Sequence, residues 1–554
     1  MNKRQLPWAL MGMAGLLCVG DLMEASLALG QERGRDSGDS RGGESLFFFS
    51  RPRPTQPDDT FTRMFPGLSA FASASDEMRD KVKKLGEKGG LIDAADNLTD
   101  PVQSITNPTV FSPNNPDNPN MTAGVTFFGQ FLDHDLTLDL KSPLLERADP
   151  RRTTNFRTAA FDLDSVYGEG PDNSPELYDR SSGDIKFRVD ALLGSQAVSR
   201  KGALRYDLPR DGNLNAIIGD SRNDENVVIA QFHLAMLRFH NAVVDHLRAT
   251  PRYAGEAPDR VFQQAQRLVR WHYQWIVVHE FLPMTIGQDR VDSIMRRGPR
   301  FYNVDDSSRS REFRNGRNEP LIPIEFSVAA YRFGHSQVRP SYRLNFGVDN
   351  ASQVFVFAFD DTIDPNETDP NDLRGGKRAP RRFVDWQTFF DFGDGSVRNN
   401  KKIDTKLSSV LMHLLGSRGP APGMPSDGVQ SLASRNLMRH VNFGIPSGQA
   451  IARAMGVPAL TPAQLSELSS FGMDRSTPLW YYILKEAAVM ENGLRLGPVG
   501  GGIVGEVFVG LLRADSSSYL SANRGWRPEL PSATPGQFRM TDLLKFAGVV
   551  PPLN

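Results

Sequence analysis

The sequence has a single cysteine, Cys18, among its 554 residues. A chain with one cysteine forms no internal disulfide, and without its first thirty residues it has no thiolate ligand at all. Cys-based zinc sites and iron–sulfur clusters are therefore excluded. The chain also lacks an excess of either charge, with 64 Lys and Arg against 65 Asp and Glu. Such a balance gives no general attraction to nucleic acid or to an anionic membrane, and we expect no nucleic-acid partner.

An apolar run near the start of the chain, Leu6–Val19, follows the basic residues Lys3 and Arg4 and precedes small residues that end at Gly30. This order is typical of an export signal, so we expect residues 1–30 to be a signal peptide. A single-span anchor is the alternative, but the run is shorter than the roughly 20 residues that a spanning helix needs. We therefore expect the mature chain to be secreted or periplasmic, without a stable membrane span.

The rest of the chain divides by composition. Residues 31–59 are rich in Gly, Ser, Arg, Asp and Pro, which predicts a disordered linker. No repeat or second long low-complexity segment follows, so residues 60–554 are expected to form one domain, with an exposed loop near Asp360–Pro380. Helical periodicity dominates from Phe128 onward. It predicts a mostly α domain with a few short β segments.

The stretch Thr126–Leu140, TFFGQFLDHDLTLDL, is apolar except for a few polar side chains, among them Gln130, Asp133, His134 and Asp135. Burying so many ionisable groups is costly unless each has a partner. In a helix Gln130 and His134 share one face, and the two aspartates project to either side of it. A histidine in an apolar helix is more often a hydrogen-bonded core residue than a catalyst. The pattern nevertheless lets one helix serve two sites.

Oxygen ligands alternate with apolar or small residues in the next stretch, Thr158–Gly168, TAAFDLDSVYG. The side chains of Thr158, Asp162 and Asp164 supply hard oxygen donors and no soft donor. That combination favours calcium. A capped turn is the simpler alternative.

The stretch Gly219–Asn241, GDSRNDENVVIAQFHLAMLRFHN, predicts a helix that is capped by Asp220 or Ser221 and has an acidic first turn. Arg222 and Glu225 lie three residues apart and can share a face. A surface ion pair, with a stabilisation below about 1 kcal/mol, is the alternative interpretation.

Two later stretches contain histidines. Trp271–Pro283, WHYQWIVVHEFLP, holds two of them beside Glu280, but it lacks the HExxH spacing of a zinc hydrolase and predicts a buried helix with hydrogen-bonded histidines. Phe326–Pro340, FSVAAYRFGHSQVRP, places His335 next to Gly334. A glycine there lets a planar group approach the backbone.

Together with Ser431–Pro446, SLASRNLMRHVNFGIP, these stretches resemble, in the right order, five motifs of the animal-type haem peroxidases of the peroxidase–cyclooxygenase superfamily. GQFLDHDLTL resembles the distal-histidine helix, TAAFDLDSVYG the calcium loop, and GDSRNDE with RFHN the family's GDxRxxE and REHN. YRFGHS resembles the proximal AFRxGHS/T, and the last stretch resembles LNxQRxRDHGLP. The branch that includes myeloperoxidase and lactoperoxidase is the nearest in pattern.

The resemblance implies a role for each matching residue. It makes His134 the distal acid–base group, Arg222 the distal arginine and Gln130 the residue that positions water and halide. On the other side it makes His335 the haem iron ligand, hydrogen-bonded to Asn436, and Arg332 the partner of a haem propionate.

Two further sets of residues follow from the resemblance. Asp133 and Glu225 match carboxylates that form ester bonds to haem b. The calcium ligands implied by the match are Asp135, Thr158, the carbonyl of Ala160, Asp162 and Asp164.

The sequence also departs from the family pattern. Asp164 replaces a serine, Asn226 stands where myeloperoxidase carries a sulfonium-forming methionine, and Asn442 and Phe443 replace Asp and His. Asn442 and Phe443 indicate a distant bacterial-type branch. The missing methionine at Asn226 disfavours chloride oxidation.

The implied function is a secreted haem peroxidase that uses H₂O₂ to oxidise bromide, iodide, thiocyanate or phenolic donors. A fatty-acid dioxygenase of the same superfamily is one alternative, but it needs a tyrosine three residues before the proximal histidine. Arg332 holds that position, and Tyr331 is one residue away from it. A secreted binding or adhesion protein on a peroxidase scaffold is the other. Such a protein would be expected to lose site residues, and none is lost.

Overall fold

The computed structural model describes residues 59–100, 103, 113–139, 142–302, 304, 313–315, 319–348, 354–357, 367–413 and 429–550. The expected signal peptide, with Cys18, and the expected linker up to residue 58 lie outside the described residues. So does the first part of the expected loop near Asp360–Pro380.

Helices dominate the described residues, which confirms the mostly α prediction. The longer ones are α2 (Asp76–Gly86), α4 (Ala123–Leu136), α6 (Val227–Arg248), α7 (Pro258–Ile276), α9 (Gln288–Arg297), α11 (Leu432–Phe443), α12 (Gly448–Met455), α13 (Leu479–Met490) and α14 (Pro498–Ala514). The shorter ones are α5 (Asp164–Tyr167), α8 (Leu282–Ile286), α15 (Tyr519–Ala522) and α16 (Met540–Phe546). Strands pair only as three antiparallel ladders within this part of the chain: β1 (Asp117–Thr122) with β6 (Asn399–Lys401), β2 (Asp190–Leu192) with β3 (Arg205–Asp207), and β4 (Ser341–Asn345) with β5 (Val354–Phe357).

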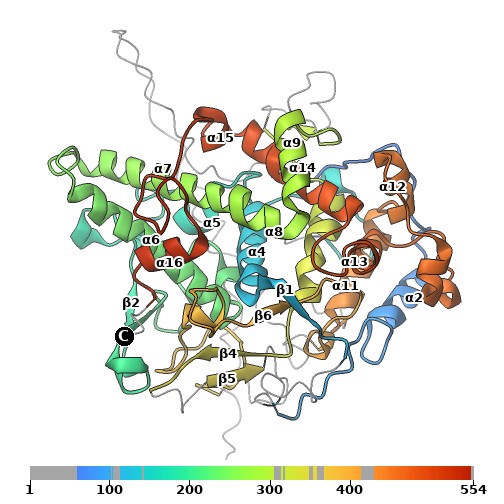
Figure 1. Ribbon diagram of the computed structural model, residues 1–554, viewed down its shortest axis with the longest axis horizontal. Coiled ribbons are helices and arrows are strands. Elements are labelled where there is room, and N and C mark those ends of the chain that lie inside the picture. The colour runs from blue at the N-terminus through green and yellow to red at the C-terminus, as the bar shows by residue number, and fades with distance from the viewer. Residues whose placement is uncertain are drawn as a thin grey trace, which may run out of the picture. The chain divides into compact units, whose positions relative to one another are not determined.

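Helix α4 lies among the other helices, where it packs against α6 (Figure 1). Its Phe128 and Phe131 are buried and both contact the ring of Phe232 on α6, with ring centroids 5.7 and 5.0 Å apart. Burying each aromatic ring contributes about 1.5–3 kcal/mol, so this face anchors the helix. The polar side chains of α4 are thereby held inside the protein.

The helix expected from Asp220 or Ser221 onward is two elements. A 3₁₀ turn, η6 (Ser221–Asp224), is capped by Asp220, and α6 begins only at Val227. Asn226 is extended, with φ −143° and ψ 156°, and its side chain accepts a hydrogen bond from the Ile229 amide at 2.9 Å. Because this second cap restarts the helix, the prediction of one continuous helix was wrong. Arg222 and Glu225 consequently lie outside α6.

His335 also lies on an irregular segment. A π-helical turn, η8 (Glu325–Ala329), leads into a 3₁₀ helix, η9 (Ala330–Gln337), through a break at Ala329 with φ −125° and ψ −77°. The buried carboxylate of Glu325 accepts hydrogen bonds from the amides of Met64 and Phe65 at 2.8 and 3.1 Å. The segment that presents His335 is thus fixed by a distant part of the chain.

Helix α6 is also the one described helix that is long and apolar enough to cross a membrane. Of its most apolar stretch, 83 % is buried inside the protein. A core helix passes the same test, so this property does not point to a membrane span.

Candidate functional site

His134 lies on the buried face of α4, next to η6. Its Nδ1 is 2.8 Å from Oδ1 of Asn223, whose Nδ2 is 3.0 Å from Nδ1 of His233. With the amide in this orientation, Nδ1 of His134 carries the ring proton and donates it to Asn223. Nε2 of His134 therefore keeps its lone pair.

Arg222 is held beside His134 by a single carboxylate. Its Nε and Nη2 donate to the two oxygens of Asp220 at 3.1 and 2.7 Å, and Nη2 also donates to the His134 carbonyl at 3.0 Å. Burial alone would raise the pKa of Asp220, but Arg222 and Arg157 together hold that pKa below its ordinary value. Asp220 is thus a charged anchor for Arg222.

Gln130 and His134, which share a face of α4, both approach Glu225. Gln130 donates a short hydrogen bond to Oε1 of Glu225, and Nε2 of His134 is 3.9 Å from the same oxygen. Asn226 donates to Oε1 of Gln130 at 3.4 Å. Asp133 accepts a hydrogen bond from the Thr137 hydroxyl at 3.0 Å.

Burial changes the ionisation of two of these groups. Burial, aided by Arg222, lowers the pKa of His134 to about 4, so the ring is neutral at pH 7. Burial also raises the pKa of Glu225 to about 7, partly opposed by Arg222. The Glu225 side chain nevertheless keeps 46 % of its surface accessible, whereas that of His134 keeps 6 %. Of the two groups, the carboxyl is therefore the one that a ligand can reach more easily.

His335 is paired with Asn436 across η9 and α11. Asn436 donates through Nδ2 to Nδ1 of His335 at 2.8 Å and accepts from Nη1 of Arg332 at 3.3 Å. Burial and Arg332 lower the pKa of His335 to about 3, which keeps the ring neutral. Burial, with Arg439 close by, lowers the pKa of Arg332 to about 10. The structure thus brings the three predicted residues of this side together.

The two histidine-bearing segments are joined directly. The Tyr331 hydroxyl on η9 donates to the Gly129 carbonyl on α4 at 3.0 Å. No atom lies within 4 Å of the place where a side chain would begin on Gly334. The open space beside Gly334 and the two neutral histidines fit a flat group with a metal at its centre.

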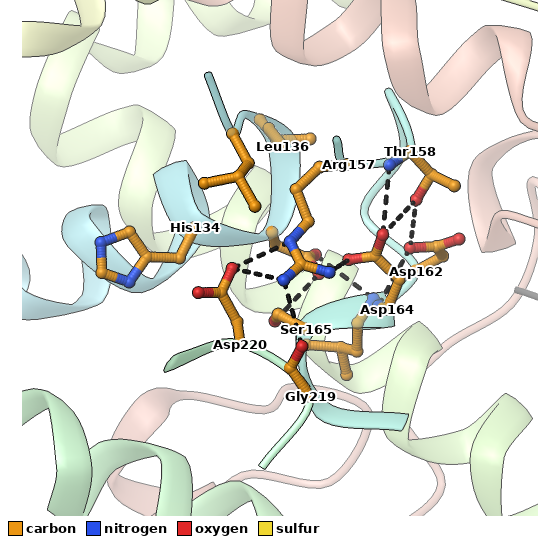
Figure 2. A network of polar contacts seen from close by, with 12 residues as sticks. His134, Leu136, Arg157, Thr158, Asp162, Asp164, Ser165, Gly219 and Asp220 are labelled. Atoms are coloured by element: carbon orange, nitrogen blue, oxygen red, sulfur yellow. Dashed lines mark hydrogen bonds and ion pairs between the residues drawn. The ribbon is translucent and has the colours of Figure 1, made fainter. Parts of the chain in front are cut away.

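Three carboxylates on the other side of α4 form a second cluster. Oxygens of Asp135, Asp162 and Asp164 lie within 4.8 Å of one another. Burial is the largest cause of the raised pKa of each, helped for Asp135 by the other two, and the pKa of Asp164 reaches about 7. The Thr158 hydroxyl is 2.9 Å from Asp162 and 3.2 Å from Asp164 (Figure 2). Three acids this close together, with one arginine 3.6 Å from Asp164, fit a hard divalent ion.

The histidines of α7 and the turn after it do not form a metal site. His272 contacts the Leu268 carbonyl at 2.7 Å, whereas His279 stacks on Trp275 with ring centroids 3.7 Å apart. Glu280 accepts a hydrogen bond from the Met540 amide. Among the described residues the acidic cluster on α4 and its neighbouring loop is the one group of three potential ligands.

The sequence interpretation did not identify three residues of this region, Asn223, His233 and Arg157. The signal for Asn223 is weak, because an amide between Arg222 and an acidic residue has no distinctive spacing. His233 and Arg157 are recognisable only by partners that lie far away in the sequence.

A family model described as "Animal haem peroxidase" matches residues 141–512. This match covers the loop of Asp162, the Arg222 turn and the segments of His335 and Asn436, but it begins after α4.

Curated relatives match the chain over more than half of its length. Chorion peroxidase of Aedes aegypti is 25 % identical over 330 residues, which are 59 % of this chain and 37 % of the relative. Peroxinectin A of Dictyostelium discoideum is 25 % identical over 54 % of this chain and 48 % of its own. Human thyroid peroxidase is 28 % identical over 58 % and 32 %. The chain thus spans between about a third and a half of the length of these relatives.

Solved structures share the fold. Peroxidase A from Dictyostelium discoideum superposes with a TM-score of 0.52 at 17 % identity, over 89 % of this chain and 96 % of that one. The fatty acid alpha-dioxygenase of Oryza sativa gives 0.52 at 13 % identity, over 84 % and 76 %. The match to the family model, which covers more than half of the sequence, shows that the chain belongs to the animal haem peroxidase family.

Proposed function

We propose that this protein is a haem peroxidase that reduces H₂O₂ and oxidises a small donor. The observation that carries the proposal is a pair of neutral histidines on two joined segments, of which His134 is buried beside a fixed arginine. Haem b, when bound, would supply the redox chemistry. His335 would hold its iron and His134 would face its open side.

His134 would move the proton of the peroxide. Nε2 has the free lone pair, so it would accept a proton from one oxygen of H₂O₂ and return it to the other as the O–O bond breaks. Asn223 would keep the other ring nitrogen protonated during both transfers. Arg222, fixed by Asp220, would stabilise the negative charge that develops as the O–O bond breaks.

Asn436 would determine which ring nitrogen of His335 carries the proton. For Nε2 of His335 to be a metal ligand, Nδ1 must keep the ring proton, and Asn436 must then present its oxygen. A half-turn of the amide does this and ends its hydrogen bond with Arg332. The guanidinium of Arg332 would then be available to a haem propionate.

Calcium is the cation that we assign to the cluster of Asp135, Asp162 and Asp164, with the Thr158 hydroxyl and the Ala160 carbonyl as further ligands. The donor set is oxygen only, and three buried carboxylates need positive charge. Asp135 adjoins His134 in α4, so the ion would stiffen the end of the helix that presents the distal histidine.

Bromide, iodide, thiocyanate or phenols are the donors that we favour. Gln130 contacts the carboxylate of Glu225, which His134 also approaches. Its side chain is therefore suited to hold water or a halide beside His134. Asn226 caps α6 and offers no sulfur for an additional bond to haem, which disfavours chloride. We further propose that the protein belongs to a bacterial-type branch and acts outside the cytoplasm, as its N-terminal sequence predicts.

The dioxygenase alternative stays weaker, because Arg332 has the position of the required tyrosine and Tyr331 donates its hydroxyl to Gly129. A secreted binding or adhesion protein would not need the hydrogen bonds that orient His134 and Arg222, so we favour the peroxidase over this alternative.

Asp133 and Glu225 should attach the haem covalently. Asp133 lies beside His134 in α4, and Glu225 contacts Gln130 of the same helix, so both carboxylates are near the residues that would face the haem. Acid-acetone extraction should leave haem on the wild-type chain, and a double Asp133→Asn, Glu225→Gln variant should release it. Full release from the wild type would contradict ester linkage and leave the peroxidase proposal intact.

The test of the function itself is spectroscopic and then catalytic. The purified, haem-loaded chain should show a Soret band and should halogenate monochlorodimedone in the presence of H₂O₂ and bromide. Turnover of phenols without halogenation would retain the peroxidase and remove the halide role. A chain that takes up no haem after reconstitution would overturn the proposal.

A further inference from the structure

Arg157 is a buried arginine that stands between the acidic cluster and the distal site (Figure 2). Its Nε and Nη2 donate to Oδ2 of Asp220 at 2.8 and 2.6 Å, and Nη2 also donates to the Gly219 carbonyl at 3.1 Å. On its other side Nη1 is 3.6 Å from Oδ1 of Asp164, a buried oxygen that accepts no hydrogen bond. One guanidinium therefore faces both sites.

Asp220 is shared by two arginines. Its Oδ2 accepts from Nη2 of Arg157 and also from Nη2 of Arg222, at 2.6 and 2.7 Å. Its Oδ1 accepts from the amide and from Nε of Arg222 at 2.9 and 3.1 Å. If one arginine interacts more strongly with Asp220, the hydrogen bonds between Asp220 and the other arginine become weaker.

The chain at Gly219, just before η6, is in close contact with the first turn of α5. A side chain on Gly219 would begin 2.7 Å from the carbonyl oxygen of Ser165, in the first turn of α5, which carries Asp164. The chain entering η6 therefore packs directly against the start of α5. Any shift of Asp164 or of its charge is felt by Arg157 across this contact.

We propose that Arg157 is a positioning residue that couples cation binding at the acidic cluster to the hold on Arg222. This inference rests on the proposed function, from which it takes the cation and the role of Arg222. A divalent ion competes with Arg157 for Asp164 and repels its guanidinium. The guanidinium of Arg157 then interacts with Asp220 alone and binds it more strongly. The hydrogen bonds between Asp220 and Arg222 become weaker as a result. This link is separate from the covalent one between Asp135 and His134.

Coupling of this kind is reciprocal, so a change at Arg222 must alter cation affinity. Arg222→Lys is the informative variant, because it keeps the charge but cannot grip both oxygens of Asp220. Asp220 then draws Arg157 away from Asp164, and competition with the cation weakens. We expect Ca²⁺ to bind about fivefold more tightly, at the lower end of typical coupling between sites.

The experiment is a double-mutant cycle read by isothermal titration calorimetry with Ca²⁺, on the full chain after chelation and without peroxide. In an Arg157→Gln background, Arg222→Lys should leave the Ca²⁺ affinity unchanged within twofold. An equal effect of Arg222→Lys in both backgrounds, or no effect in the wild-type background, would overturn the coupling. A purely long-range field predicts no effect, since Arg222→Lys conserves charge.

A second background covers the case in which Arg157→Gln does not fold, as judged by circular dichroism. Arg157→Lys keeps a positive charge but cannot span Asp164 and Asp220, so it should abolish the effect equally. Haem uptake and peroxide turnover are measured separately. If the protein is a peroxidase but the two substitutions act additively on Ca²⁺ affinity, only this inference is wrong. If the substitutions are coupled but the chain takes up no haem, the proposed function is wrong.

Discussion

Replacing His134 with alanine should slow the reaction of the haem-loaded protein with H₂O₂ by about 100- to 10 000-fold, the range for loss of a general acid–base group. The reason is the free lone pair at Nε2, which no other described histidine offers on this face of α4. The second-order rate constant is measured by stopped-flow absorbance at pH 7. The Soret band should persist, because His335 is untouched.

The matched control is His246→Ala, which removes a histidine near the end of α6 that packs on Phe546. It should leave the rate constant within twofold. A rate constant for His134→Ala that is equally unaffected would show that another group moves the proton.

The same rate constant has a defined pH dependence. His134 acts as a base in its neutral form, and its pKa of about 4 lies below the ordinary value because the ring is buried near Arg222. The rate constant should therefore be flat from pH 7 to about pH 5 and fall as the pH drops through about 4. A fall already centred near pH 6.5, the ordinary value for histidine, would show an exposed ring.

Without calcium, the stability of the protein should fall as the pH rises. In a chelator the folded state binds protons at Asp164 more tightly than the unfolded state does, because its pKa is raised from 3.8 to about 7. The stability that comes from this group is complete below pH 3.8 and is lost as the pH rises through about 7. Because a tenfold change in proton affinity corresponds to ~1.36 kcal/mol, this loss amounts to a few kcal/mol.

Calorimetric melting of the chelated protein should thus give a lower melting temperature at pH 8 than at pH 5. Excess Ca²⁺ should remove most of that difference, because the ion stabilises the charged carboxylates. Asp162→Asn should weaken the calcium effect, whereas Asp172→Asn, at an exposed position, should not. Melting temperatures at pH 8 that are the same with and without Ca²⁺ would contradict a calcium site.

Local features could be predicted from the sequence. Helix α4 and the shared face of Gln130 and His134 follow from periodicity, since the positions of side chains along one helix are fixed by its geometry. The acidic loop could be predicted for the same reason, because Thr158, Asp162 and Asp164 are neighbours in the chain. For each of the two sites, the residues that are neighbours in the sequence could therefore be predicted.

Features that depend on packing could not be predicted. The start of α6 moved to Val227 because two capping side chains, Asp220 and Asn226, compete within six residues and only the structure shows that both are used. The contact between Asn223 and His134 joins segments 89 residues apart. Arg157 meets Asp220 across 63 residues. No spacing rule reports such pairs, because they depend on how separate elements dock.

The hydrogen bond from Tyr331 to Gly129 has a consequence for assembly. It holds α4 and η9 together with protein groups alone, and Tyr331 stacks on Phe326 with ring centroids 4.8 Å apart, which fixes its ring. Protein contacts alone therefore position the segments of His134 and His335 relative to each other. If the protein binds haem as proposed, we expect the polypeptide to fold first and to take up haem afterwards.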